Sequence, residues 1–502
     1  MMRLRHSTLP ALGMAQYMSH VDLTRKLQVA VTLKLPDPAG LDEFISELYD
    51  PSSPNFHQFL TPQQFAAQFG PTQTDYDAVK HYLRGKGLKI THEYANHLVI
   101  DAKGPAGTME RAFGVSINNY RAAGRSFIAN DSDVQLPASI QSVVGGVSGL
   151  NDYLQLQPHL RATQNQGHFW WGPSKPVGFT PQQIASAYDF TGAYSAGYTG
   201  AGQTLAIATA YGFSSSDISS FFSQFKVTVP KYSVVAVDGT TRSTNVETTL
   251  DLQRSGSMAY GASIIVYEGV NANFGTFEDV YNAIVSNANV SVVTTSWGIC
   301  EAQMPSSNLN ADHAIFVSAA AEGQAWFAAS GDSGAKDCGT SALAVDYPSS
   351  DPNVAATGGT SLKLNTSGTI SSETTWSGAG GGVSTVFAKP SYQNALGGSF
   401  RQTSDVALDA DPNTGYPVLY GGRWTEYGGT SFAAPQWAAL FAIAQQARGK
   451  IGAANPAVYG LNGLGFHDIT SGSNGGYSAG TGWDNPTGWG TPDAWVLTKN
   501  LP

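Results

Sequence analysis

The sequence predicts an α/β protein in two parts, a small α+β domain followed by a larger domain built on a mostly parallel sheet. From Thr180 onward, short apolar runs alternate with helical or loop segments, which is the pattern of a parallel sheet flanked by helices. Before residue 151, predicted strands and helices interleave within roughly 120 residues, which is typical of a compact split βαβ, or ferredoxin-like, domain. The chain has 502 residues, more than one ordinary domain needs, which agrees with two parts.

Hydrophobic periodicity predicts the elements of the front domain. Residues 27–35 alternate apolar and polar side chains as a strand does, and residues 39–48 repeat them at helical spacing. The other predicted helices are 61–69, 74–85 and 105–113, and the other predicted strands are 88–94, 97–101, 115–120 and 126–129. We expect this domain to span 27–151, after a flexible lead over 1–26. Residues 152–179 are polar and rich in Gly and Pro, so we expect a linker with a processing site there.

The larger domain is expected over residues 180–502. Its predicted strands are Gln203–Ala208, Lys231–Val237, Ala262–Tyr267, Ser291–Thr295, Ala325–Ala329 and Val354–Ala356. Loops at the carboxyl ends of parallel strands are where such sheets build their sites. Residues that follow these strands are therefore the first candidates for a functional role.

Composition and charge exclude some classes of function. Charged residues make up only 13% of the chain, which suits a protein that must stay folded where carboxylates lose their charge. Residues 180–502 hold 12 basic and 23 acidic residues, a net charge of −11, whereas residues 1–179 hold 15 and 14, a net charge of +1. An acidic body argues against nucleic acid as a partner. A near-neutral front domain facing an acidic body is compatible with an intramolecular lid.

The chain has two cysteines, Cys300 and Cys338, which cannot form a four-ligand zinc site alone. A single disulfide fits an exported protein, and two free thiols are the alternative. No membrane-spanning run is present, so no membrane partner is expected. The basic start has no apolar segment behind it, so no cleavable signal peptide is visible.

One stretch, Tyr427 to Pro435, places Ser431 between small residues and a long apolar run with helical composition. The pattern predicts a tight turn that leads into a buried helix, with Ser431 near the helix N-terminus. Glycines let a substrate approach, and the helix end supplies free N–H groups. A serine nucleophile suits such a setting, although a serine that only caps a helix has the same pattern.

Acidic residues supply candidates for a base, because the region after Thr180 has only His313 and His467, neither in a recognisable motif. Glu247 and Asp251 are four residues apart, so on a helix they point to the same side. Sharing one proton would raise one pKa of the pair and keep Glu247 available as a base. Two exposed acids on a helix face are the alternative interpretation.

A third candidate, Asp332, follows an apolar strand in a glycine turn. Kept protonated, it would donate a hydrogen bond to an oxyanion. The alternative is an Asp that satisfies its own turn.

Together, Glu247-x-x-x-Asp251, Ser330-Gly-Asp332 and Gly429-Thr-Ser431-x-x-x-Pro435 resemble the motifs of the sedolisin, or serine-carboxyl peptidase, family. The stretch from Ser53 to Phe65 resembles the propeptide of kumamolisin-like pro-enzymes in that family, and the resemblance covers the chain from about residue 27.

The resemblance implies a subtilisin-like catalytic domain whose nucleophile is Ser431. It implies that Glu247 is the general base, that Asp251 orients Glu247, and that Asp332 serves the oxyanion. The segment Ser296-Trp-Gly298 also matches the family. Some members carry a further Glu that bonds this Trp, but the strand from Leu205 to Tyr211 has no acid, so we expect that extended network to be absent.

The resemblance also implies one structural Ca²⁺ in the C-terminal loop. Its implied ligands are the carboxylates of Asp468 and Asp484 and the carbonyl oxygens of Ile469, Gly480 and Gly482. Oxygen ligands on a glycine-rich loop suit Ca²⁺ rather than a transition metal.

The sequence is therefore interpreted as the zymogen of a secreted, acid-active serine endopeptidase that processes itself. Expected partners are peptide or protein substrates and the chain's own propeptide as an intramolecular inhibitor, and a monomer is expected. A catalytically inactive binding relative, a tripeptidyl-type exopeptidase and an esterase are the alternatives. The missing Gly-x-Ser-x-Gly motif disfavours the esterase. Cleavage preference and the position of the propeptide cut are left open by the sequence.

Overall fold

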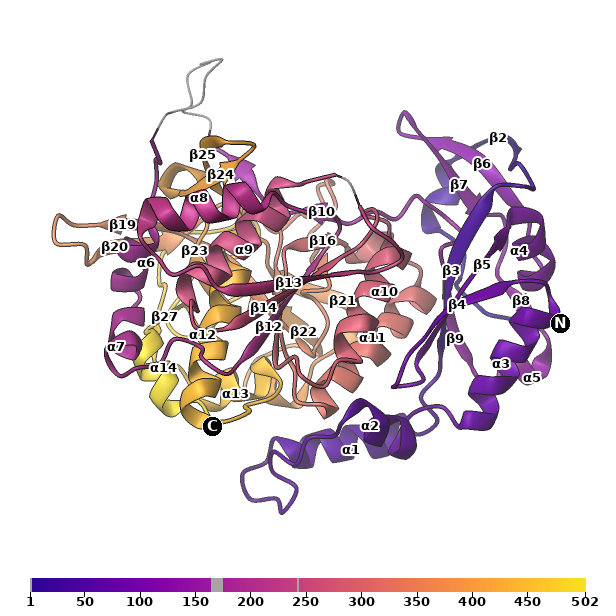
Figure 1. The fold of residues 1–502 in the computed structure, drawn as a ribbon, viewed down its shortest axis with the longest axis horizontal. Coiled ribbons are helices and arrows are strands. Elements are labelled where there is room, and N and C mark those ends of the chain that lie inside the picture. Colours follow the sequence, from indigo (N-terminus) through magenta and orange to yellow (C-terminus); the bar gives the residue numbers. More distant parts are fainter. Residues whose placement is uncertain (1, 164–174, 242) are drawn as a thin grey trace. The chain divides into compact units, whose positions relative to one another are not determined.

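The computed structural model describes residues 2–163, 175–241 and 243–502 (Figure 1). The chain forms two compact units. Unit 1 comprises residues 1–156, 271–288 and 303–322, and unit 2 comprises 157–270, 289–302 and 323–502. Part of the predicted linker, residues 164–174, lies outside the described residues.

A four-stranded antiparallel sheet forms the centre of unit 1. Its strands are β3 (Lys26–Leu33), β4 (Lys89–Glu93), β5 (Val99–Pro105) and β9 (Val144–Ser148), in the order β4-β5-β3-β9. Helices α3 (Gln73–Gly85) and α4 (Ala106–Phe113) complete a split βαβ arrangement, which confirms the predicted α+β fold. Alternate β3 side chains, among them Val29 and Val31, are buried in the core with Leu83 and Met109.

The remaining helices of this region also begin at sequence signals. Thr61 and Gln64 form a capping box at the start of α2, and Thr72 caps α3. Gly114 ends α4 with φ = 63°, a conformation that favours glycine. The other helices here are η1 (Pro10–Met14), α1 (Pro38–Leu48), α2 (Pro62–Gln68) and α5 (Ala138–Gln141).

Part of the N-terminal segment differs from the flexible lead expected over residues 1–26. Strand β1 (Met2–Arg3) pairs with β8 (Gln135–Leu136), and β2 (Gln16–His20) pairs with β6 (Ile117–Ala122), which pairs in turn with β7 (Arg125–Asn130). Backbone pairing and burial of Leu4, Leu9 and Val21 order this segment. All side chains of β2 are exposed, so no alternation of buried and exposed positions predicts this strand from the sequence.

Two helices from the later sequence belong to unit 1. They are α10 (Phe274–Val285), which packs on β3, and α11 (Ser306–Ala321), which packs on β9. Polar contacts join them to the front segment. Asn96 donates to Asn282 at 2.7 Å, Asn308 donates to Ser148 at 2.7 Å, and the Thr32 hydroxyl donates to Glu278. Unit 1 therefore includes two helices that follow the predicted linker, residues 152–179, in the sequence.

An eight-stranded sheet forms the centre of unit 2, and every pair in it is parallel except β19 with β20. Its order is β13-β14-β12-β15-β17-β19-β20, with β23 also beside β19. The strands are β12 (Thr204–Thr209), β13 (Lys231–Ala236), β14 (Ser263–Glu268), β15 (Val292–Thr295), β17 (Ala325–Ala329), β19 (Val354–Leu364), β20 (Ile370–Thr375) and β23 (Val406–Asp409). All six strands predicted for this domain are present.

Two buried helices pack against this sheet and against each other, α9 (Val246–Met258) and α12 (Ala433–Arg448). The Trp437 indole of α12 donates to the Ala407 carbonyl at 2.9 Å, which ties the helix to β23. The other helices of unit 2 are α6 (Pro181–Ala187), α7 (Phe190–Ser195), α8 (Ser215–Phe225), η3 (Ser391–Gln393), η4 (Pro412–Thr414), η5 (Thr430–Phe432), α13 (Ala454–Gly460) and α14 (Ala494–Asn500). The other strands are β10 (Gln157–Pro158), β11 (Arg161–Ala162), β16 (Trp297–Cys300), β18 (Asp346–Tyr347), β21 (Gly382–Ala388), β22 (Phe400–Thr403), β24 (Tyr416–Tyr420), β25 (Arg423–Gly428), β26 (Phe466–His467) and β27 (Thr491–Pro492).

Cys300 and Cys338 are joined in a disulfide, which settles the choice between a bridge and two free thiols. The bridge ties the end of β16 to the loop that follows β17. Among the described residues, the longest apolar helices are too short or too polar to cross a membrane.

Candidate active site

Glu247 and Asp251 lie on the first two turns of α9, where the Asn245 side chain accepts a hydrogen bond from the Glu247 N–H at 2.8 Å. Both side chains are fully buried, which excludes the interpretation of two exposed acids. Burial, followed by the negative charge of Asp251, raises the pKa of Glu247 well above its usual value, and burial also raises the pKa of Asp251. The pair therefore retains a proton to a higher pH than an exposed pair would.

Ser296, between β15 and β16, connects this pair to the predicted nucleophile. Its hydroxyl lies 2.6 Å from Oδ1 of Asp251 and 3.3 Å from the backbone oxygen of Ser431. The Ser431 hydroxyl in turn lies 3.4 Å from the Ser296 carbonyl oxygen. The hydroxyls of Ser431 and Ser296 both act to lower the pKa of Glu247 against the effect of burial. The structure thus brings Glu247, Asp251 and Ser431 together.

Asp332 follows strand β17, at the carboxyl edge of the sheet, and is 7% exposed. Its Oδ1 accepts from the N–H of Thr430 at 2.8 Å and from the hydroxyl of Thr430 at 3.0 Å. Burial raises the pKa of Asp332, while His159, Thr430 and Arg161 act against that rise. Asp332 therefore contacts the residue before Ser431 rather than only its own turn.

The turn before Ser431 has the geometry that its glycines predict. Gly429 has φ = 120°, and η5 and α12 follow directly. A Cβ at Gly429 would collide with the His159 carbonyl oxygen and with Oδ2 of Asp332, so those two atoms are neighbours across the glycine. The predicted turn and buried helix are confirmed.

The segment 157–163 runs through this site in an extended conformation. Gln157 and Pro158 pair antiparallel with β16, and Arg161 and Ala162 pair antiparallel with β25. Between these two pairings, the Ser431 N–H donates to the His159 carbonyl oxygen at 3.0 Å. The segment is thus held on both sides of the His159–Leu160 peptide bond, with the His159 carbonyl at Ser431.

The His159 side chain is buried and forms an ion pair with Asp346, the first residue of β18. Burial alone would lower the pKa of His159, but Asp346, together with Asp332 and Asp337, raises it to about 9. A Cβ at Gly298 would collide with both members of the pair, so the glycine leaves the space that they fill. Sequence reasoning missed His159 and Asp346, since neither lies in a motif and only the fold brings them together.

Trp297 has a partner although the neighbouring strand carries no acid. Its indole N–H donates to the Thr209 hydroxyl at 3.1 Å, and this hydroxyl lies 2.7 Å from that of Thr248. Thr248 donates to the Tyr211 carbonyl at 2.8 Å and directly follows Glu247. The partner of the Trp297 indole is thus the neutral hydroxyl of Thr209, which contacts Thr248, and not an acid on the strand.

The five residues implied as calcium ligands come from one loop region after β26. Gly482 N–H donates to Asp468 Oδ2 at 2.9 Å, and Gly480 N–H donates to Asp484 Oδ2 at 2.9 Å. Burial raises the pKa of Asp484, and the charge of Asp468 adds to that rise. Within residues 175–241 and 243–502, neither carboxylate has a Lys or Arg partner. Two adjacent carboxylates without a cation on a glycine-rich loop fit an oxygen-ligated Ca²⁺.

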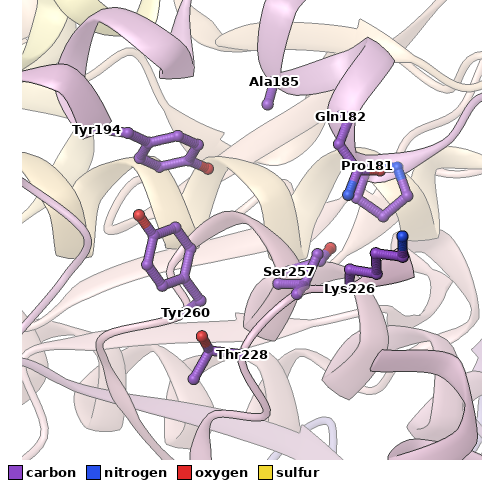
Figure 2. A pocket seen from close by; sticks show the side chains of 9 residues that line it. Pro181, Gln182, Ala185, Tyr194, Lys226, Thr228, Ser257 and Tyr260 are labelled. Atoms are coloured by element: carbon purple, nitrogen blue, oxygen red, sulfur yellow. The ribbon is translucent and has the colours of Figure 1, made fainter. Parts of the chain in front are cut away.

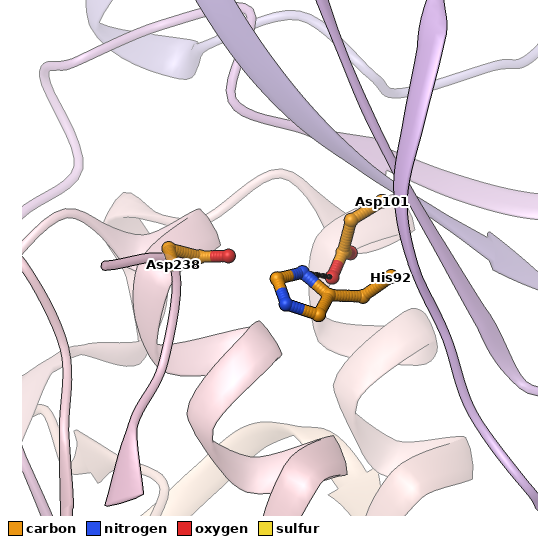
Figure 3. Close-up of side chains that lie close together, drawn as sticks. All are labelled: His92, Asp101 and Asp238. Atoms are coloured by element: carbon orange, nitrogen blue, oxygen red, sulfur yellow. Dashed lines mark ion pairs between the residues drawn. The ribbon is translucent and has the colours of Figure 1, made fainter.

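Two other features do not make a second catalytic site. His92 and Asp101, on adjacent strands β4 and β5 of unit 1, form an ion pair of 3.5 Å (Figure 3), which offers too few ligands for a closed metal site. Asp238, drawn with them, belongs to unit 2. A pocket of about 310 Å³ in unit 2 is lined by Tyr194, Tyr260 and seven other residues (Figure 2), none of them a predicted catalytic residue.

The fold and the buried serine–carboxylate cluster define a subtilisin-like peptidase with an activation domain, and comparison with known proteins agrees. Residues 14–153 match the family model described as the pro-kumamolisin activation domain, and residues 201–490 match the subtilase family. Kumamolisin of Bacillus sp. (strain MN-32) is 34% identical over 467 residues, which are 86% of this chain and 84% of that protein. The chain belongs to the sedolisin, or serine-carboxyl peptidase, family and is a zymogen.

Solved and curated relatives extend this result. The structure of Pseudomonas sedolisin (serine-carboxyl proteinase) complexed with two molecules of pseudo-iodotyrostatin matches with a TM-score of 0.59 and 31% identity, over 65% of this chain and 98% of that one. Tripeptidyl-peptidase 1 of Rattus norvegicus is 26% identical over 530 residues, covering 96% of this chain and 93% of that protein. The relatives thus include a peptidase named for removing tripeptides.

Proposed function

We propose that the chain is an acid-active serine endopeptidase that releases its own propeptide. The observation that carries this proposal is the Ser431 N–H, which donates to the His159 carbonyl while the Ser431 hydroxyl lies beside the buried pair Glu247 and Asp251. A peptide carbonyl at a serine nucleophile, with a base beside it, is the arrangement of an acyl-transfer site.

The proposed reaction has two stages, acylation of Ser431 and hydrolysis of the acyl ester. Glu247 takes the Ser431 hydroxyl proton as the oxygen attacks the peptide carbonyl, and Asp251 supports Glu247 through their shared proton. The Ser431 N–H and protonated Asp332 donate to the oxyanion. Glu247 then gives its proton to the leaving amine, which leaves an acyl ester on Ser431. Glu247 next takes a proton from water as the water oxygen bonds to the ester carbon. It returns this proton to the Ser431 oxygen as the ester C–O bond breaks, which releases the carboxyl product and restores the Ser431 hydroxyl.

This mechanism requires acid. Asp332 donates to the oxyanion only while it carries a proton, and the Glu247–Asp251 pair must hold one proton and not two. Activity is therefore expected to fall at high pH, as Asp332 ionises, and on the acid side, as the pair becomes fully protonated. Burial raises the pKa of both Glu247 and Asp251, so it moves this acid limit upward. Burial of Asp332 extends the active range upward, since it raises the pKa of that carboxyl.

The position of the segment 157–163, with the His159 carbonyl at Ser431, supports His159–Leu160 as the proposed self-cleavage bond. This bond lies within the linker proposed over 152–179, between the propeptide at 27–151 and the catalytic domain at 180–502. The ion pair of His159 with Asp346 supports a role for Asp346 in recognising a basic side chain before the cleaved bond. Cleavage there would release an N-terminal fragment that ends at His159.

Endopeptidase action is favoured over tripeptide removal by the same segment. The chain continues without a break for more than three residues before His159, with Gln157 and Pro158 paired on β16. An exopeptidase site would need a barrier that stops a chain at the third residue.

For the C-terminal loop, we propose one structural Ca²⁺ held by Asp468, Ile469, Gly480, Gly482 and Asp484, where the ion would fix the loop without a role in the reaction. Secretion and a monomeric state are likewise proposed, in line with the low charge content and the intramolecular propeptide.

The test is acid incubation of purified full-length protein beside a Ser431→Ala variant, followed by intact mass and N-terminal sequencing. Wild type should lose a fragment ending at His159, expose Leu160 as a new N-terminus and then digest denatured protein, while the variant stays whole. A wild-type chain that stays whole and cuts no peptide would favour an inactive binding relative.

A further inference from the structure

Arg161, in the segment 157–163, is a second cation besides His159 that lies near the Asp332 carboxyl. Arg161 is the second residue after the proposed bond, and its Nε lies 3.9 Å from Oδ2 of Asp332. Its guanidinium also donates to the Ser333 hydroxyl at 3.3 Å. Pairing of Arg161 and Ala162 with β25 fixes the backbone that carries this side chain. Arg161 is thus directed to Asp332 by three separate contacts.

Asp332 has one oxygen occupied and one available. Oδ1 accepts both hydrogen bonds from Thr430, whereas Oδ2, within the described residues, has no hydrogen-bond donor. Oδ2 is also the oxygen that neighbours the His159 carbonyl across Gly429. The oxygen suited to carry the proton for the oxyanion is therefore the one that faces Arg161.

We propose that Arg161 is an electrostatic brake, because a cation at the second position after the cleaved bond stabilises the ionised form of Asp332, which has no proton to donate. The same subsite would then disfavour Arg or Lys in any substrate, more strongly as the pH rises. This inference rests on the proposed function, since it assigns Asp332 to the oxyanion.

The other charges around Asp332 determine how large the effect is. His159 also favours the ionised carboxylate. Glu247, on α9, and Asp337, on the same loop, also face Asp332, and the Asp332 charge raises the pKa of each. Among them, Arg161 is the one whose side chain is 51% exposed, so solvent weakens its effect. Cleavage leaves Leu160 and Arg161 at the new N-terminus of the catalytic chain, so the brake would be released only when that N-terminal segment leaves β25.

The direction of the effect follows from the sign of the charge. A nearby cation lowers the pKa of a carboxyl, so Asp332 beside Arg161 loses its proton at a lower pH than Asp332 alone. The upper pH limit of cleavage should then lie lower for a substrate with Arg at this position. For a half-exposed pair the expected difference is about half a pH unit.

Two peptides copying residues 155–163 test the proposal in trans, one with Arg and one with citrulline at the position of Arg161. Citrulline keeps the shape of the side chain and removes its charge. Mature enzyme is assayed for kcat and kcat/KM against both peptides from about pH 3 to about pH 7. We expect the upper limit of kcat to lie higher for the citrulline peptide, with little difference at the acid end.

The zymogen supplies a second measurement. Arg161→Gln should process itself faster than wild type near the upper pH limit, whereas Arg423→Gln, which removes an exposed charge from β25, should behave as wild type. Equal upper limits for both peptides, or an equal shift in the Arg423→Gln variant, would overturn the brake while leaving the peptidase assignment intact. Failure to cut either peptide would overturn the proposed function itself.

Discussion

The hydroxyl of Ser296 lies 2.6 Å from Oδ1 of Asp251, and both groups are fully buried. Through its backbone, Ser296 also contacts Ser431, so a single residue connects the acid pair to the proposed nucleophile. Ser296 therefore contacts both the acid pair and Ser431, and removing its hydroxyl should slow the chemical step.

Replacing Ser296 by Ala should lower kcat by roughly 10- to 100-fold with little change in KM, because Asp251 loses its hydrogen-bond donor and orients Glu247 less well. Steady-state kinetics on one peptide at several pH values checks this. Ser296→Thr keeps the hydroxyl and serves as the matched variant. A rise in KM alone would show that Ser296 acts in binding instead.

Asp346→Asn should reduce the preference for a basic residue before the cleaved bond. The variant keeps the shape of the side chain but lacks the charge that pairs with His159. We expect kcat/KM to fall by about 10-fold for peptides with His or Arg at that position. Peptides with Leu there are the internal control and should be cut as before. An equal loss for all peptides would mean that Asp346 only supports the local fold.

Two acids of unit 2, the fully buried Asp409 and the half-buried Glu373, predict stability that depends on pH. Burial raises the pKa of each, and Tyr188 donates to Glu373 at 2.7 Å. A carboxyl whose pKa is higher in the folded state binds its proton more tightly there. The stabilisation is complete below the unfolded value, near 4, and is lost as pH rises through the folded value.

The free energy of unfolding should therefore decline with rising pH, by about 1.4 kcal/mol per pH unit for each such group. Thermal melts of Ser431→Ala protein across pH measure this without self-digestion. Asp409→Asn keeps an acceptor for the Leu362 N–H and should flatten the decline. A melting temperature that rises with pH in the wild type would contradict the assignment.

Removal of calcium should lower the thermal stability of the catalytic domain. If Ca²⁺ is present at 100 times its Kd, its loss costs about 2.7 kcal/mol. Melts in EGTA, and after return of Ca²⁺ or Mg²⁺, check this, with recovery expected for Ca²⁺ alone. Asp468→Asn should resemble the EGTA-treated protein and respond little to either ion. An unchanged melt in EGTA would count against the site.

The sequence by itself determined the features that depend on neighbouring residues. Periodicity located the sheet strands, spacing placed Glu247 and Asp251 on one side of α9, and the glycines before Ser431 predicted its turn. Each of these follows from backbone geometry over a few residues, which a local pattern records.

Only the tertiary structure decided which distant residues meet. It paired Cys300 with Cys338, brought His159 to Asp346 and Ser431, and assigned α10 and α11 to the unit of the front domain. Arg161 and Asp332 are 171 positions apart and meet because β11 pairs with β25. Such contacts depend on strand pairing and burial across the whole chain, so the residues involved carry no local signal.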